Sequence, residues 1–249
     1  MSALITILLP GLHGTADLFE RFVAAAPADI APRIQPLPND APLGYDALAE
    51  WILARLPQEP LVLIAESYSG PLALLVADRA PQVVGLVLCV TFVEPPAPAF
   101  LAHIPMPVFG VTPPVVAISA LLTGGDRALA REVQRTVRAL RADVIASRIA
   151  SALHVDASAE LQRFSKPLLC LSASRDWIVP ARSAATMRAL NPSAEFVTID
   201  GPHMILQTRP AEVWKYISAF LDRVQSRDAE SGTVARAANP TLRTGEPRP

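Results

Sequence analysis

Cysteine is scarce in this sequence, and the side chains that usually bind metals are scattered. Only Cys89 and Cys170 occur among 249 residues. Each lies in an apolar run typical of a buried strand, so we expect two reduced thiols in the core rather than a disulfide. No group of cysteine and histidine residues has the spacing of metal ligands, so the sequence predicts neither a metal nor another cofactor.

The sequence also lacks a long uninterrupted apolar segment and a large excess of charge. Its most apolar later stretch, residues 104–122, is broken by four prolines, which argues against a membrane-spanning helix. Residues 1–11 are apolar but show neither a basic leader nor a small-residue cleavage site, so they indicate a first strand rather than a signal peptide. With a formal net charge of −1, nucleic acid is not an expected partner. These features predict a cytoplasmic protein without a membrane span.

Short apolar runs alternate with amphipathic helical patterns along much of the chain. The composition is 51% hydrophobic, which is enough for one large core. Strands buried on both faces and separated by helices indicate an α/β fold with a mainly parallel sheet. The predicted sheet has about six strands, at residues 3–9, 33–37, 61–65, 83–90, 168–172 and 195–199. The helices predicted to flank it are residues 17–26, 45–56, 72–79, 181–190 and 210–223.

Two segments depart from this alternation. Residues 95–164 contain no strand pattern but have helical periodicity, and a structureless loop of that length is improbable in a compact domain. We therefore predict a helical cap inserted into a core formed by residues 1–94 and 165–225. Residues 226–249 are rich in Arg, Ala, Pro, Thr and Glu without periodicity, and we expect a disordered tail.

The strongest functional signal is the segment LVLIAESYSGPLALL, residues 61–75. A buried strand runs directly into a turn of small residues and then into a helix, with Ser67 at the tip of the turn. A serine in this position is exposed above the carboxyl ends of the strands, where open α/β sheets bind their ligands. The N-terminal N–H groups of the following helix favour negative charge at the same place. Ser69 is the local competitor, but at the start of a helix its hydroxyl is expected to act as a cap.

Two further polar residues follow strands at the same edge of the predicted sheet. Asp176 lies in the loop after the strand at residues 168–172, and His203 lies in the loop after the strand at residues 195–199. A histidine can take the proton of a serine hydroxyl, and a carboxylate can orient the histidine and stabilise its protonated form. Asp200 is a rival carboxylate, but it is too near His203 in the same loop to approach the ring easily from behind.

The turn around Ser67 resembles the nucleophile elbow of the α/β-hydrolase superfamily, usually written G-x-S-x-G. Ala65 and Ser69 replace its two glycines, but both are small. The order of Ser67, Asp176 and His203 along the chain is also that of the superfamily, and the resemblance covers about residues 3–222. It implies an α/β-hydrolase fold in which Ser67 is the nucleophile, His203 the base and Asp176 the orienting acid.

The same resemblance implies an oxyanion hole of two backbone N–H groups. One donor is expected at Tyr68, directly after the nucleophile, and the other in the loop PGLHG after the first strand. If Pro10-Gly11 corresponds to the His-Gly pair of many family members, the donor is Leu12. If His13-Gly14 corresponds to that pair, the donor is Thr15. We prefer Leu12 because it follows the strand end more directly.

Two ionisable residues, His13 and Glu66, lie beside these motifs. His13 is predicted to line the entrance of the substrate site, although a solvated loop histidine fits the sequence equally well. Glu66 precedes the nucleophile, where it either tunes the site electrostatically or, as is more common, contacts neighbouring loops.

The predicted cap offers two hints about substrates and partners. The apolar side chains of residues 104–122 suit a hydrophobic pocket for an acyl or aryl group. The following helical segment places four arginines on one face, which is usually a solvated surface but also suits an anionic substrate or an acidic carrier protein. These residues are Arg127, Arg131, Arg135 and Arg138.

The sequence therefore predicts a serine hydrolase that cleaves the carboxylic ester of a small-molecule acyl substrate through an acyl-enzyme intermediate. A thioesterase, or an esterase acting on carrier-bound acyl groups, is the nearest alternative, since one triad serves several reactions. A non-catalytic small-molecule receptor on the same fold is the alternative of another class, although a receptor needs no complete triad.

Overall fold

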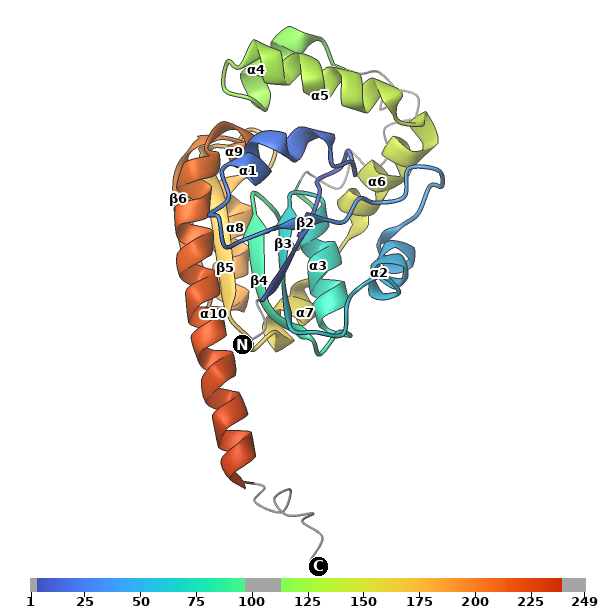
Figure 1. The fold of residues 1–249 in the computed structure, drawn as a ribbon. Coiled ribbons are helices and arrows are strands. Elements are labelled where there is room, and N and C mark those ends of the chain that lie inside the picture. The colour runs from blue at the N-terminus through green and yellow to red at the C-terminus, as the bar shows by residue number, and fades with distance from the viewer. Residues whose placement is uncertain (1–3, 97–112, 239–249) are drawn as a thin grey trace, which may run out of the picture.

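The structure is a computed structural model that describes residues 4–96 and 113–238, with side chains up to residue 227. Six strands form one parallel sheet in the order β2-β1-β3-β4-β5-β6 (Figure 1). This confirms the predicted α/β architecture and its six strands. The strands are β1 (Ile5–Leu9), β2 (Arg33–Ile34), β3 (Leu61–Glu66), β4 (Val83–Cys89), β5 (Leu168–Arg175) and β6 (Glu195–Pro202).

The central strand β3 explains why its sequence is apolar without alternation. Leu63 and Ala65 lie in one hydrophobic core, whereas Val62 and Ile64 lie in a second core on the other face of the sheet. The first core also receives side chains from α2 (Tyr45–Leu53), α3 (Ser69–Ala77), α7 (Ser158–Arg163) and α8 (Ala181–Leu190). The second core receives side chains from α1 (Glu20–Ala24), α9 (Ile205–Thr208) and α10 (Pro210–Ala238).

Three helices lie beyond the carboxyl edge of the sheet, above the end of β3 (Figure 1). They are α4 (Val115–Leu121), α5 (Arg127–Ala139) and α6 (Ala142–His154). The next helix, α7, packs against α3 and α8 beside the sheet, so the inserted segment ends in the body of the molecule. Residues 97–112, which supply much of the predicted apolar cap, lie outside the described residues. The division into core and cap stays a prediction.

The last helix is longer than the sequence predicted. We expected it to end at residue 223 and the chain to be disordered from residue 226, whereas α10 continues to Ala238. Apolar periodicity does stop there, but alanine, arginine and glutamate favour a helix, and no proline occurs before Pro240. The expected end was wrong because it relied on periodicity alone. Residues 239–249 lie outside the described residues.

Candidate active site

The turn between β3 and α3 holds Ser67 in an unusual backbone conformation. Its φ is 51°, in the left-handed region that residues with a side chain rarely adopt. The Ser67 N–H donates to the Cys89 carbonyl at 2.9 Å, and the Ser67 carbonyl accepts bonds from Gly70 N–H and the Thr91 hydroxyl. Contacts on both sides thus maintain the strained turn that the sequence predicted as an elbow.

The two small residues after Ser67 have different packing roles. At Gly70, a Cβ atom would lie 2.0 Å from Thr91 Oγ1, so no larger residue fits without displacing Thr91. Ser69 is fully buried, and its hydroxyl donates to the Pro10 carbonyl at 2.5 Å. The expectation that Ser69 caps its helix was therefore wrong, because its hydroxyl bonds the loop after β1 instead. A buried hydroxyl engaged in this way is poorly placed to compete with Ser67 as a nucleophile.

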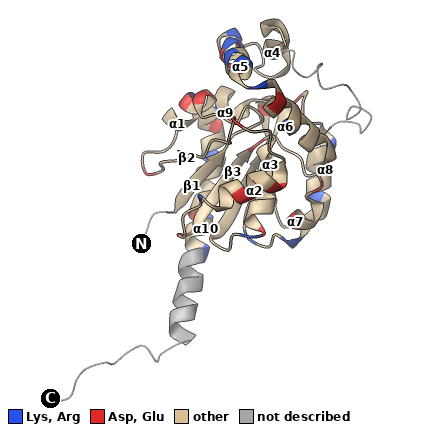
Figure 2. Ribbon diagram, turned by 90° about the vertical axis from the view of Figure 1, so that its right-hand side faces the viewer, with Lys and Arg blue, Asp and Glu red and all other residues tan. Residues whose placement is uncertain are grey.

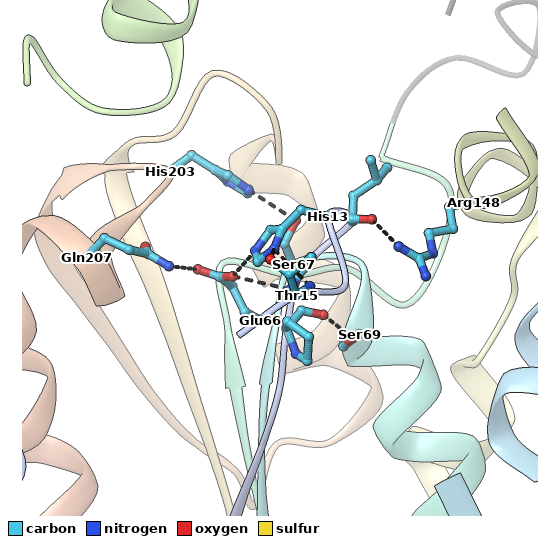
Figure 3. A network of polar contacts seen from close by, with 11 residues as sticks. His13, Thr15, Glu66, Ser67, Ser69, Arg148, His203 and Gln207 are labelled. Carbon is cyan, nitrogen blue, oxygen red and sulfur yellow. Dashed lines mark hydrogen bonds and ion pairs between the residues drawn. The ribbon is translucent and has the colours of Figure 1, made fainter. Parts of the chain in front are cut away.

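The structure brings Ser67, His203 and Asp176 together from three separate loops. His203 Nε2 lies 3.0 Å from Ser67 Oγ, and His203 Nδ1 lies 2.8 Å from Asp176 Oδ2. The other oxygen of Asp176 accepts N–H bonds from Ile178 and Val179, each at 2.8 Å, which fixes the carboxylate. Figure 3 shows the imidazole of His203 directed at Ser67. In this geometry Nδ1–H donates to Asp176 and Nε2 accepts the serine proton.

The rival carboxylate, Asp200, lies away from the imidazole. It is exposed and accepts bonds from Ser174 and Arg175. These two hydrogen bonds lower the pKa of Asp200 below its usual range. Asp200 therefore belongs to a surface ion pair, and Asp176 is the carboxylate that contacts His203.

The loop after β1 begins with three residues, Pro10, Gly11 and Leu12, whose backbone groups differ in their partners. The Gly11 N–H donates to Glu66 at 3.3 Å, and the Gly11 carbonyl accepts from Gly14 N–H at 2.9 Å. The Leu12 N–H has no partner among the described residues, and neither has that of Tyr68. By contrast, the rival donor Thr15 points its N–H at His13 Nδ1, 3.2 Å away. The geometry therefore favours Leu12 over Thr15 as the donor from this loop.

Glu66 is a buried carboxylate at the centre of this loop contact. It accepts hydrogen bonds from Gly11 N–H and from Gln207 at 2.9 Å, and its nearer oxygen lies 3.7 Å from His13 Nε2. Burial opposes ionisation, but the contacts with His13 and Gln207 hold the pKa of Glu66 below its usual value of 4.5. Glu66 thus contacts the neighbouring loops through Gly11, His13 and Gln207.

A cavity of about 290 Å³ opens beside Ser67. His13 lines it and is itself buried, while its contact with substrate stays a prediction. Its wall is mostly apolar and comes from α5, α6 and the loops below them. Side chains of this wall include Leu18, Val133, Val137, Ile149, Leu153 and Met204.

Metal ligands and thiols are the other reactive groups to consider in the part of the chain that the structure describes. No group of three or more His, Cys, Asp or Glu residues there is arranged to hold a metal ion. Cys89 and Cys170 are both free and buried, and burial raises the pKa of Cys170 to about 12. A thiol with so high a pKa is a poor nucleophile at neutral pH.

The arginine face predicted on α5 is exposed to solvent. Figure 2 marks the positions of its arginines as blue segments of the ribbon. Arg127, Arg131, Arg135 and Arg138 form no ion pair within the described ranges. None of the described helices is long and apolar enough to cross a bilayer.

Three residues of this region had no signal in the sequence. Thr91 supports the elbow, Gln207 binds Glu66, and Arg148 reaches the loop after β1 from α6. Each acts through a contact between segments far apart in the chain, so neither periodicity nor a motif could identify it.

Comparison with known proteins agrees with the fold. The model of an alpha/beta hydrolase family matches residues 5–215. An enol-lactonase from Burkholderia xenovorans has a similar structure, with a TM-score of 0.75 and 16% identity, over 89% of this chain and 92% of that one. An esterase from Thermogutta terrifontis gives a TM-score of 0.76 and 18% identity, over 90% of this chain and 91% of that one.

MenH from S. aureus gives a TM-score of 0.74 at 14% identity, over 90% of this chain and 96% of that one. No curated protein matches the sequence. Such low identities show a shared fold, whereas the family model covers most of the chain. The chain therefore belongs to the alpha/beta hydrolase family.

Proposed function

We propose that this protein is a serine hydrolase that cleaves carboxylic esters through an acyl-enzyme intermediate. The observation that carries the proposal is the continuous contact from Asp176 through His203 to Ser67, at 2.8 and 3.0 Å, beside an apolar cavity. A complete chain of this kind supports catalysis over the alternative of a receptor, because ligand binding alone requires none of its proton transfers.

In the first step, Ser67 Oγ attacks the ester carbonyl carbon while its proton moves to His203 Nε2. Asp176 stays ionised and stabilises the imidazolium through Nδ1–H. The free N–H groups of Leu12 and Tyr68 receive the oxygen that becomes negative. His203 then returns the proton to the departing alcohol, which leaves the acyl group on Ser67. Water, activated by the same imidazole, releases the acid.

The cavity favours an uncharged acyl group of small or medium size. Its volume of about 290 Å³ is near the lower end for small-molecule sites. Its described lining contains no lysine or arginine that could pair with an anionic substrate. Aliphatic esters therefore suit the site better than substrates with a charged acyl chain.

A thioester, with the acyl group on an acidic carrier protein, is the second candidate substrate. The exposed arginines of α5 are the observation that favours it, since unpaired cations attract an acidic surface. Replacing Arg131 and Arg135 with Glu would weaken carrier-linked turnover, most strongly at low salt, while turnover of a small neutral ester stays unchanged. Equal turnover of carrier-linked substrate by both proteins would remove this candidate.

The proposal is tested by turnover of nitrophenyl esters and matching thioesters of graded acyl length. Wild type is expected to hydrolyse neutral short and medium esters, and Ser67→Ala to lose that activity by several orders of magnitude. Ser193→Ala is the matched control, because the Ser193 hydroxyl bonds only Asn191 among the described residues. Retained turnover in folded Ser67→Ala would overturn the proposal.

A further inference from the structure

Arg148 is a buried cation without a carboxylate partner among the described residues. The residue is only 1% exposed. Its Nη1 donates to the Leu12 carbonyl at 2.8 Å, and its Nη2 donates to Pro38 and Asn39 oxygens at 3.0 and 2.9 Å. Burying a guanidinium that only neutral oxygens satisfy costs free energy of folding, so the position calls for an explanation other than stability.

The Leu12 carbonyl is one end of a short segment that is held on every side. Ser69 binds the Pro10 carbonyl, Glu66 binds the Gly11 N–H, and Arg148 binds the Leu12 carbonyl. Figure 3 shows Gln207 and Arg148 approaching the group around Ser67 from opposite sides. The one polar backbone group between these contacts without a partner in the described chain is the Leu12 N–H.

The backbone of the loop after β1 passes close to the guanidinium of Arg148 at Gly14. Gly14 has a φ of 68°, and a Cβ atom there would lie 2.5 Å from Arg148 Nη1. The loop can therefore turn back and approach Arg148 closely only because residue 14 has no side chain.

The helix that carries Arg148 also forms part of the substrate cavity. Ile149, Ala152 and Leu153 of α6 line the wall, directly after Arg148 in the sequence. Glu66 and Ser69, in contrast, hold the loop from the nucleophile turn. The loop after β1 that carries Leu12 is thus fixed to the turn at Ser67 on one side and to α6, which lines the cavity, on the other.

We propose that Arg148 is a positioning residue that fixes the Leu12 N–H for the oxyanion and joins the acyl-binding helix α6 to the oxyanion hole. This inference rests on the proposed serine-hydrolase function. Because the Leu12 N–H acts on charge that develops only in the transition state, loss of Arg148 lowers kcat and leaves KM nearly unchanged. A contact that merely stabilised the fold would not produce that separation.

The test compares Arg148→Met and Arg148→Lys with Arg141→Met. Arg141 lies at the start of the same helix and binds the Asp40 carbonyl at 2.8 Å, but it makes no contact with Leu12. The readouts are kcat and KM for one neutral ester, the affinity for a trifluoromethyl ketone that forms a tetrahedral adduct with serine, and the thermal unfolding curve.

Arg148→Met is expected to lower kcat about tenfold to hundredfold, less than or similar to the loss of a direct oxyanion donor. Affinity for the ketone falls in the same proportion as kcat/KM. Arg148→Lys recovers part of kcat, since one ammonium can reach the Leu12 carbonyl but cannot make all three bonds. Arg141→Met stays within about twofold of wild type.

A folded Arg148→Met protein with wild-type kcat and wild-type affinity for the ketone would overturn the inference. A raised KM with unchanged kcat would overturn it as well. If Arg148→Met does not fold, Asn39→Ala is tested in its place, because that change removes one of the acceptors that hold the guanidinium. An unchanged kcat in Asn39→Ala would equally overturn the inference. Absence of ester turnover in wild type would instead contradict the proposed function itself.

Discussion

The nucleophile turn and the loop after β1 face each other across the candidate site, but they are built differently. The turn at Ser67 is built by small residues that follow directly in the sequence, although Cys89 and Thr91 also hold it from the end of β4. The loop at Leu12 is held by side chains from remote segments, above all Glu66 and Arg148. A local motif therefore reveals the first region, whereas only the folded chain reveals the second.

Among the variants that separate these two regions from their surroundings, replacement of Asp176 is expected to have the largest effect. Asp176→Asn should lower kcat by about four orders of magnitude, the loss known from serine proteases when the same change disturbs the histidine tautomer. Asp200→Asn is the matched control and should leave kcat within about twofold, because Asp200 contacts Arg175 rather than His203. Steady-state kinetics of both variants decide between the two carboxylates, and a larger loss in Asp200→Asn would contradict the assignment.

The next largest effect is expected on the stability of the protein, when the packing between Gly70 and Thr91 is disturbed. In Gly70→Ala the new methyl group meets Thr91, so we expect the free energy of unfolding to fall by about 1–3 kcal/mol. Urea unfolding measures the change. Thr91→Ala should restore part of the loss when combined with Gly70→Ala, and the absence of any coupling between the two would show that the close approach does not matter.

The contact between turn and loop can be weakened through Ser69. Ser69→Ala leaves the buried Pro10 carbonyl without its donor, which should cost about 1–3 kcal/mol of stability. Because that carbonyl lies next to the loop that carries Leu12, kcat should fall more than KM changes. Urea unfolding and steady-state kinetics, with Ser193→Ala as the control, separate these effects. Unchanged stability would contradict the role given to this hydroxyl.

The smallest effect concerns the charge of Glu66. Its pKa lies below the usual 4.5 in the folded protein, so the ionised carboxylate adds stability that is present above pH 4.5 and is lost as pH falls through the folded pKa. Wild type should therefore be more stable than Glu66→Gln at pH 7, and the difference should shrink below about pH 4.5. Urea unfolding of both proteins at several pH values measures this difference in stability. A difference that does not change with pH would contradict the lowered pKa of Glu66.

The same contrast explains how much could be predicted from the sequence. The sheet and the positions of Ser67, Asp176 and His203 follow from one rule, since each residue comes directly after a parallel strand and such strand ends share one edge. Their catalytic roles stay a prediction. The sequence left Leu12 and Thr15 open as donors, because the choice depends on which N–H the folded loop leaves free.

Two other features were missed, for different reasons. Arg148 belongs to the inserted segment, for which the sequence indicated only helical periodicity, and its burial follows only from where α6 meets the loops below. The end of α10 was missed because helix propensity, rather than an apolar face, continues that helix.

The central claim is that Ser67 is the nucleophile, and covalent labelling tests it most directly. A fluorophosphonate should react with wild type, and mass spectrometry of its peptides should place one adduct on Ser67. The label should be absent from Ser67→Ala and form much more slowly in His203→Ala, because the imidazole activates the hydroxyl. An adduct on Ser69 or another serine, or efficient labelling of Ser67→Ala, would contradict the account.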